Sequence, residues 1–178
     1  NGHDFSFNNQ TKIAFGNFTN RWEFGDLTTD TNKHISTKKY SVYGTYKVLL
    51  ISTSNNNCKD SISKLIRINA SPVTKFAIDK DRQCFRGNVF NYTNQSTIPQ
   101  GTLTYQWSLG ESKKSTLKDI LNHKYTTEDS FNVQLIATSN KFCTDTINHL
   151  AVTYAQPVAN FVVPQDSQCW QKHYFIII

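Results

Sequence analysis

The feature that most constrains this chain is an internal repeat of 85 residues that aligns without a gap. Residues 1–93 and 86–178 carry the same pattern, and about a third of the overlapping positions are identical. A fixed period is the sequence signature of a repeat architecture. What repeats in such a chain is normally scaffold. The coinciding residues include Trp22 with Trp107, Tyr40 with Tyr125, Cys58 with Cys143, Asp60 with Asp145, Pro72 with Pro157, Phe76 with Phe161, and Cys84 with Cys169.

The length of the period sets the size of the repeated unit. It is too long for a solenoid repeat, which is one supersecondary unit that buries its core against its neighbours. It is long enough for a small domain with a core of its own. Each module opens with Pro-Val, at Pro72 and at Pro157. We therefore predict a module lacking its first strand at 1–70, a complete module at 71–155, and the opening strands of a third at 156–178.

Composition narrows the class of protein. The chain has no methionine and no apolar run long enough to cross a membrane. We therefore interpret it as part of a longer mature polypeptide that is not membrane-embedded, with any targeting signal outside this segment. The formal net charge of +6 is spread along the chain, and its densest runs are the pairs Lys38–Lys39 and Lys113–Lys114. This spread argues against a nucleic-acid partner and leaves anionic polysaccharide or a membrane surface open.

Apolar and polar residues alternate with a period of two. Tyr105, Trp107 and Leu109 point to one side of a strand, with Gln106 and Ser108 on the other. Several such strands, separated by polar turn clusters, predict an all-β fold of tandem immunoglobulin-like antiparallel β-sandwiches. The tryptophan of each module is expected between the two sheets. In the second module the predicted strands cover residues 73–79, 87–93, 103–109, 118–125, 130–138 and 144–154.

A family resemblance follows from one motif that occurs twice. The first copy is Trp-Glu-Phe-Gly-Asp at 22–26, Tyr40, and Gly-Thr-Tyr-Lys-Val-Leu-Leu at 44–50. The second is Trp-Ser-Leu-Gly-Glu at 107–111, His-Lys-Tyr at 123–125, and Phe-Asn-Val-Gln-Leu at 131–135. This pattern resembles the PKD (polycystic kidney disease) domain family, and it implies immunoglobulin-like sandwiches of the kind found mainly in extracellular proteins. The core signature residues that it assigns are Trp22, Tyr40, Tyr46, Trp107, Tyr125 and Phe131.

The chain departs from the family pattern W-x-F-G-D-G at its last glycine. Leu27 and Ser112 stand there, so we carry over neither an ion site nor a special turn geometry. The variant with two cysteines per module resembles the long tandem PKD-type arrays of Bacteroidetes cell-surface proteins. These include gliding-motility adhesins that are exported by the type IX route.

Each full period holds two cysteines, and regular cysteines in a small β module indicate disulfides in an oxidising compartment. Buried free thiols and metal ligation are the alternatives, although no C-x-x-C pair or nearby His-Cys pair supports a metal. Cys84 precedes the second strand and Cys143 lies in the last hairpin, so we expect them at opposite ends of the module, too far apart to bond. Our hypothesis is that the hairpin cysteine of one module bridges to the first cysteine of the module before it. The disulfide candidates are Cys58, Cys84, Cys143 and Cys169.

Two further motifs contain candidate modification sites. Asp-Ser-Ile at 60–62 and Asp-Thr-Ile at 145–147 resemble the Bacteroidetes O-glycosylation acceptor, which makes Ser61 and Thr146 candidates. Alternatively, these residues simply begin the last strand. No histidine coincides with another at the 85-residue shift, and no phosphate loop, nucleophile elbow or zinc signature occurs. The sequence therefore predicts no enzyme, no cofactor and no metal.

These observations favour a structural and adhesive repeat segment of a long extracellular surface protein, acting as a spacer or filament. Its expected partners are adjacent repeats of the same polypeptide, and further ones are a surface polysaccharide or another cell-surface protein. The alternative is a carbohydrate- or protein-binding accessory module of a secreted hydrolase. Phe85 and Trp170, which align beside the cysteines, are the remaining candidates for surface or inter-module contact. A second alternative is that the first module accepts its opening strand from another chain.

Overall fold

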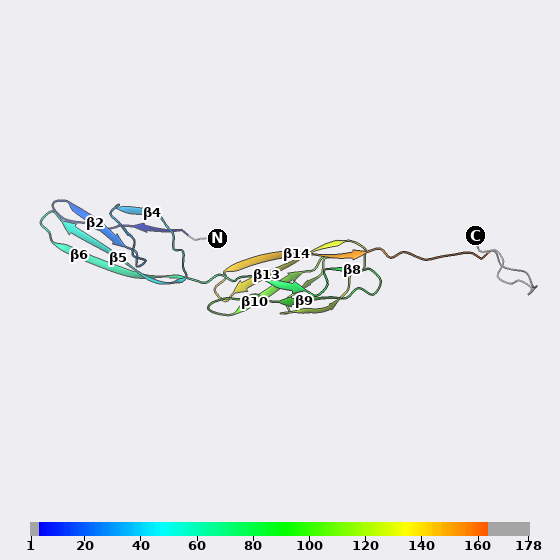
Figure 1. The fold of residues 1–178 in the computed structure, drawn as a ribbon. Helices are drawn as coiled ribbons and strands as arrows, with labels where there is room; N and C mark the ends of the chain where they lie inside the picture. The colour runs from blue at the N-terminus through cyan, green and yellow to red at the C-terminus, as the bar shows by residue number, and fades with distance from the viewer. Residues whose placement is uncertain (1–3, 164–178) are drawn as a thin grey trace, which may run out of the picture.

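The chain folds into two groups of β-strands with separate cores. The computed structural model describes residues 4–163, and every regular element in that range is a strand. Residues 5–68 form the first unit and residues 76–154 form the second. Each unit has its own cluster of buried apolar residues. Figure 1 shows the units following one another along the chain, and the segment after β14 (Thr144–Tyr154) leaves the second unit on the side away from the first.

The first unit pairs a small sheet with a larger one. The two-stranded sheet is β1-β4, and the four-stranded sheet has the order β3-β2-β5-β6. The longest pairing is the hairpin of β5 and β6, which runs from Gly44 opposite Ile68 to Thr53 opposite Lys59. The strands are β1 (Phe5–Asn8), β2 (Phe18–Glu23), β3 (Thr29–Asp30), β4 (His34–Lys38), β5 (Gly44–Ser54) and β6 (Lys59–Ile68).

The second unit has the same plan with two additional strands. Its sheets have the orders β12-β9-β7 and β11-β10-β13-β14-β8. The additions are β7, which pairs with β9, and β8, which pairs with the end of β14. The strands are β7 (Phe76–Ile78), β8 (Arg82–Cys84), β9 (Phe90–Asn94), β10 (Leu103–Ser108), β11 (Lys114–Ser115), β12 (Ile120–His123), β13 (Ser130–Ser139) and β14 (Thr144–Tyr154).

Alternating side chains from the two sheets of each unit meet in its core. In β10 only Trp107 is fully enclosed, while its neighbours Gln106 and Ser108 face outward or lie half-buried. Trp107 and Trp22 keep 0% and 6% of their surface exposed, so neither indole lies open to water. The core of the first unit is smaller. It contains Trp22, Phe24, Ile35, Val48 and Leu50, while the core of the second unit has eleven buried residues, including Trp107.

The expected fold class is confirmed: the chain is all-β, built from immunoglobulin-like sandwiches. The strands expected in the second unit at 103–109, 130–138 and 144–154 are observed within a residue or two. One pairing differs from the expected antiparallel pattern, because β8 runs parallel to β14 and places Cys84 opposite Tyr154. The module limits at residues 70 and 155 and the third module stay predictions.

A correction concerns the turn after each tryptophan strand. Because the second glycine is missing there, we carried over no special turn geometry from the family resemblance. The structure instead gives Leu27 and Ser112 positive φ angles of 69° and 59°. Gly25 and Gly110 before them also have positive φ, and a Cβ on Gly25 would lie 2.9 Å from the carbonyl oxygen of Lys47. At both positions a residue with a Cβ therefore takes the left-handed conformation that glycine adopts without strain.

Within residues 4–163, no segment forms a helix of the length and apolar character needed to cross a membrane.

Candidate functional sites

The tryptophans and the first tyrosine of the signature make equivalent contacts in the two units. Of the six signature aromatics, Trp22, Trp107, Tyr125 and Phe131 are buried, and Tyr40 and Tyr46 are half-buried. The indole Nε1 of Trp22 donates to the carbonyl oxygen of Asn32 at 3.1 Å, and that of Trp107 donates to Leu117 at 2.9 Å. Both partners lie ten residues after the tryptophan. Because a buried N–H requires a hydrogen-bond partner, each indole holds in place the loop ten residues after it in the same unit. The signature is thus a structural feature repeated at the 85-residue shift.

The signature tyrosines also bond to equivalent backbone atoms. The hydroxyl of Tyr40 donates to the carbonyl oxygen of Phe24 at 3.0 Å, and that of Tyr125 donates to Leu109 at 2.8 Å. Burial is the main cause that raises the pKa of each of these two tyrosines to about 12. Both hydroxyls therefore stay protonated at neutral pH and serve as fixed donors. Each ring also packs on its partner in the next strand, Tyr40 on Tyr46 and Tyr125 on Phe131.

The charged residue in the turn after the tryptophan strand makes different contacts in the two units. In the first unit the Nζ of Lys38 lies 2.6 Å from the Oδ2 of Asp26 and sits near the rings of Phe24 and Tyr40. Burial alone would raise the pKa of Asp26, but the hydrogen bonds from Lys38 and Thr28 outweigh it and lower that pKa. This ion pair links the turn to β4.

In the second unit Glu111 takes the place of Asp26. Its Oε1 accepts from the backbone N–H of Thr126 at 2.8 Å and from the Thr126 hydroxyl at 2.9 Å. Burial opposes ionisation, but these bonds and Lys113 outweigh it and lower the Glu111 pKa to about 2. His123 stands where the first unit has Lys38. Burial lowers the pKa of His123, and its Nε2 is enclosed without a hydrogen-bond partner among the described residues.

The cysteines lie at opposite ends of the second unit, as their sequence positions led us to expect. Cys84 is opposite Tyr154 at the end of β14, and Cys143 immediately precedes the first residue of the same strand. Eleven residues of strand span about 35 Å, whereas a disulfide needs Cα atoms within about 7 Å. A bond between Cys84 and Cys143 is therefore excluded. Cys58, Cys84 and Cys143 form no disulfide within residues 4–163, and Cys169 lies outside the described residues.

The two hairpin cysteines occupy equivalent turns. The Sγ of Cys58 lies 3.9 Å from the carbonyl oxygen of Asn56, and that of Cys143 lies 3.9 Å from the carbonyl oxygen of Lys141. Cys58 is exposed and Cys143 is half-buried. Both thiols are thus presented at the tip of the longest hairpin of their unit, away from its core.

The two Asp-Ser/Thr motifs lie near the starts of β6 and β14. Ser61 and Thr146 are both exposed, so their hydroxyls are accessible to a modifying enzyme. Asp145 also has a structural role that the sequence did not indicate. Its Oδ2 accepts the backbone N–H of Thr74 at 2.7 Å, which holds the segment between the units against the hairpin of the second unit. Asp60 in the first unit accepts only the N–H of its neighbour Ser61 among the described residues.

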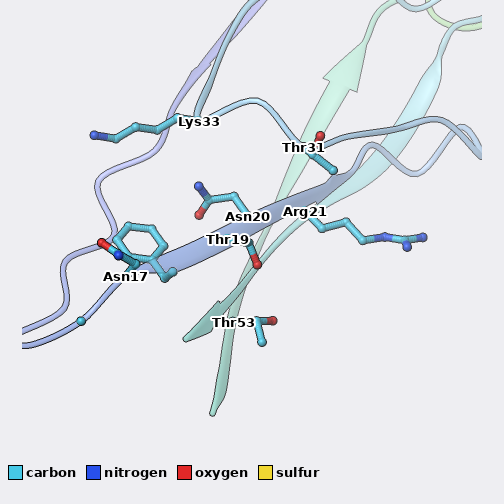
Figure 2. A pocket seen from close by; sticks show the side chains of 9 residues that line it. Asn17, Thr19, Asn20, Arg21, Thr31, Lys33 and Thr53 are labelled. Carbon is cyan, nitrogen blue, oxygen red and sulfur yellow. The ribbon is translucent and has the colours of Figure 1, made fainter. Parts of the chain in front are cut away.

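An open hollow of about 760 Å³ lies on the first unit around β2. Arg21 and Lys33 bring positive charge to it, and Arg21 is paired with Glu23 at 3.2 Å. Figure 2 shows the side chains of Arg21 and Lys33 pointing in different directions, with Asn20 between them. The two cations therefore do not converge on one point. The hollow is lined by Gly16, Asn17, Phe18, Thr19, Asn20, Arg21, Thr31, Lys33 and Thr53.

This hollow could not be predicted from the sequence, because its residues come from two separate loops and the outward face of a strand. Of the surface aromatics named from the sequence, Phe85 is half-buried and Trp170 lies outside the described residues. No group of three or more His, Cys, Asp or Glu side chains suited to a metal ion occurs within residues 4–163.

Comparison with known proteins gives structural likenesses only. No family model matches the chain. No curated protein matches it. The PKD1 domain of Vibrio anguillarum Epp is similar over 50% of this chain and 100% of that chain, with 23% identity and a TM-score of 0.43. The amphioxus IgVJ-C2 molecule is similar over 85% and 97%, with 11% identity and a TM-score of 0.41. The fibronectin(III)-like modules of Clostridium thermocellum CbhA are similar over 90% and 92%, with 10% identity and a TM-score of 0.39.

Proposed function

We propose that this chain is a non-catalytic structural segment of an extracellular surface protein, in which β-sandwich units joined end to end act as a spacer. One observation carries the proposal: the chain enters and leaves the second unit at opposite ends of β14. Thr74 is held beside Asp145 near the start of that strand, and Tyr154 ends it beside Cys84. A unit joined in this way adds its whole strand length, about 35 Å, to an array.

The repeated interior supports a scaffold role. The tryptophan and tyrosine side chains bond to equivalent backbone carbonyls in both units, so what the chain repeats is the means of holding each unit together. The large aromatics of the motif lie in the two cores and not in an exposed row. An exposed row of aromatics is what a module that holds polysaccharide would present.

The finer part of the proposal concerns the parent protein. We place the chain in a surface adhesin of the gliding-motility type that is exported by the type IX route. Its partners there are the adjacent repeats of the same polypeptide. The hairpin thiol of Cys143 faces the end at which the chain enters the unit, and Cys84 lies where it leaves. Cysteines placed in this way suit bridges between successive units, and non-reducing peptide mapping of a longer array would detect them.

Glycosylation belongs to the same proposal. Ser61 and Thr146 are exposed at equivalent places, and a sugar on each would mark the same edge of every unit. Mass spectrometry of native material would show whether the peptides that contain Ser61 and Thr146 carry the added mass of a sugar. An unmodified mass for both peptides contradicts the assignment.

Small-angle scattering tests the spacer role. A compact globule of 178 residues has a radius of gyration of about 16 Å. Two units in series, each about 35 Å long, give a value above about 20 Å. A radius near that of a compact globule contradicts end-to-end extension.

The hollow on the first unit favours a second candidate function, a carbohydrate-binding accessory module. Its lining of hydroxyl, amide and cationic side chains suits an acidic polysaccharide. Affinity electrophoresis in gels that contain an acidic or a neutral polysaccharide tests this function. Retardation that is lost in the double variant Arg21→Ala with Lys33→Ala supports it, and equal mobility with and without polysaccharide contradicts it.

A further inference from the structure

Most of the residues that line the hollow on the first unit recur in the second unit. Five of the nine are identical at the 85-residue shift, whereas only about a third of all positions in the repeat are identical. Apart from the half-buried Thr53 and Thr138, these residues are exposed in both units, so packing of the core does not account for them. The matching pairs are Gly16 with Gly101, Thr19 with Thr104, Thr31 with Thr116, Lys33 with Lys118, and Thr53 with Thr138.

We call the three threonines and the lysine of each unit its threonine–lysine frame. Two of these threonines lie opposite each other on neighbouring strands. Thr19 of β2 pairs with Thr53 of β5, and Thr104 of β10 pairs with Thr138 of β13 in the same register (Figure 2 shows the first pair). Each pair lies on the outward face of its sheet, because the tryptophan three residues after the first threonine faces the core. Threonine pairs stabilise any sheet, so the pairs alone do not indicate a ligand.

The other two residues of each frame lie in a loop, where no strand pairing requires them. Thr31 and Lys33 follow β3, and Thr116 and Lys118 follow β11. All four are exposed. Neither lysine forms an ion pair with another of the described residues. An identical threonine and an unpaired lysine at the same exposed place in both units are therefore better explained by binding than by folding.

The loop is held in the same way in both units. The residue between the threonine and the lysine is Asn32 in the first unit and Leu117 in the second. Its carbonyl oxygen accepts from the buried indole, at 3.1 Å and 2.9 Å respectively. Its N–H donates to the side chain two residues earlier, which is Asp30 or Ser115. The tryptophan of each core thus positions a threonine and a lysine beside the outward sheet face.

The glycine of each set shapes the opposite side of the surface. Gly16 and Gly101 have positive φ angles of 89° and 99°. A Cβ on Gly16 would lie 2.8 Å from the Oδ1 of Asn55, and one on Gly101 would collide with the Oδ1 of Asn140. The chain before β2 therefore approaches the hairpin as closely as the chain before β10 does. The two frames are thus bordered by the same backbone.

We propose that the second unit carries a second copy of the binding site on the first, so that one acidic polysaccharide chain binds both units. This inference rests on the second candidate function, the carbohydrate-binding module, and adds to it a second site and a ligand that spans the two. Lys33 and Lys118 each bind a carboxylate of the ligand. The threonine hydroxyls, which both donate and accept, bond to the sugar hydroxyls between the carboxylates.

The charge of the frames suits a ligand whose anionic groups are widely spaced. Each frame offers one lysine. Arg21 adds a second cation in the first unit, and Gln106 stands at the equivalent place in the second. Double-stranded DNA, with one negative charge per about 1.7 Å of its axis, needs many more cations than this. An acidic polysaccharide, whose charges are separated by neutral hydroxyls, matches single lysines set among threonines.

Two weak sites on one chain bind a long ligand much more tightly than either site alone, because the second attachment is intramolecular. The two units follow one another along the chain (Figure 1), so a ligand that reaches both must extend over the length of one unit, about 35 Å. Loss of either site should therefore remove most of the affinity for a long ligand. A ligand too short to reach both units gains nothing from the second site.

Calorimetric titration of the full chain with long carboxymethyl dextran tests the proposal, with uncharged dextran of the same length as the reference. Lys118→Ala should weaken binding by about tenfold or more. The matched control is Lys124→Ala, which removes the same charge from an exposed lysine of the same unit outside the frame, and should bind within about twofold of wild type at moderate salt.

The outcomes separate this inference from the function on which it rests. A wild-type chain that does not bind carboxymethyl dextran contradicts the carbohydrate-binding function, and the second site with it. Binding that is unchanged in Lys118→Ala, or weakened equally in Lys124→Ala, overturns the second site and leaves a site on the first unit standing. Equal binding of uncharged dextran contradicts the acidic class of ligand.

A short fragment of carboxymethyl dextran distinguishes two sites from one. Wild type and Lys118→Ala should bind it with affinities within about twofold, since the site on the first unit is intact in both. A tenfold loss for the short fragment as well would place all binding on the second unit and overturn bivalent binding.

A second variant tests the hydroxyls without changing the charge. Thr104→Val with Thr116→Val keeps the branched shape of both side chains and removes two hydroxyls, so it should weaken binding of the long chain as Lys118→Ala does. Unchanged affinity in this double variant rejects the role of the threonines.

Discussion

The backbone N–H of Thr74 donates to the side-chain Oδ2 of Asp145 at 2.7 Å, across 71 positions of sequence. This bond joins the segment between the two units to the last hairpin of the second unit. The hydrogen bond from the N–H of Thr74 is the main cause that lowers the pKa of Asp145, and burial opposes it. The carboxylate is thus held ionised by the linker that it anchors.

Asp145→Ala should loosen the linker end of the second unit. The N–H of Thr74 loses a charged acceptor, which costs about 1–3 kcal/mol. Hydrogen exchange followed by mass spectrometry should show faster exchange in peptides that contain residues 72–76 and 144–147. The matched control is Asp60→Ala, because the Asp60 carboxylate accepts only the N–H of its neighbour Ser61 among the described residues. Equal exchange in the two variants would contradict the role of Asp145.

The second unit should lose stability in acid through Glu111. The pKa of Glu111 is lowered from 4.5 to about 2 in the folded state, so its contribution is complete above pH 4.5 and is lost as pH falls towards 2. Urea unfolding should therefore separate wild type from Glu111→Gln near neutral pH, with the difference shrinking in acid. A difference that does not change with pH would argue against this assignment.

Leu27→Gly should stabilise the first unit. Leu27 has a φ of 69° and its side chain is fully exposed, so the change removes strain without removing packing. The strain is about 1–2 kcal/mol, and glycine costs about 0.5–1 kcal/mol in backbone entropy, which leaves a net gain of roughly 0.5 kcal/mol. Thermal unfolding measures the gain. Leu27→Val should lower the melting temperature, because a β-branched residue tolerates this backbone poorly.

Tyr125→Phe should cost more than Tyr40→Phe, although the two residues are equivalent in the repeat. The Tyr125 hydroxyl bonds both Leu109 and the hydroxyl of Tyr92, which is fully buried and would be left with a missing partner. We expect a loss of about 1–3 kcal/mol for Tyr125→Phe and about 1 kcal/mol for Tyr40→Phe. Urea unfolding of the two variants gives both values. The reverse order would show that the hydroxyl of the half-buried Tyr40 contributes more to the free energy of unfolding than its single hydrogen bond indicates.

The sequence predicts most of the fold because the apolar alternation is strong in the long strands. Phe131, Val133 and Leu135 point inward with Trp107, as the period of two requires. β8 was missed because Arg82-Gln83-Cys84 shows no alternation and its partner, β14, lies some 70 residues away. The strained turn at Leu27 was missed because the residue type argued against a conformation that its surroundings impose.

The candidate sites were less predictable than the fold. The separation of Cys84 from Cys143 followed from strand order alone, which the sequence indicates well. The bond between Thr74 and Asp145 requires the linker and the hairpin to meet at one end of a sandwich, and no local pattern shows that. The hollow beside Arg21 depends on how the loop at Thr31 and Lys33 crosses β2, which is likewise a tertiary feature.

The position of β14 determines how the second unit would respond to a pulling force. If the chain is stretched at Thr74 and beyond Tyr154, tension runs along the strand, and its hydrogen bonds to β13 and to the parallel β8 are loaded in shear. Bonds loaded together resist until they fail together, unlike a hairpin that is unzipped from one end. Single-molecule stretching should therefore show one high-force step for this unit, and a gradual opening at low force would contradict this geometry.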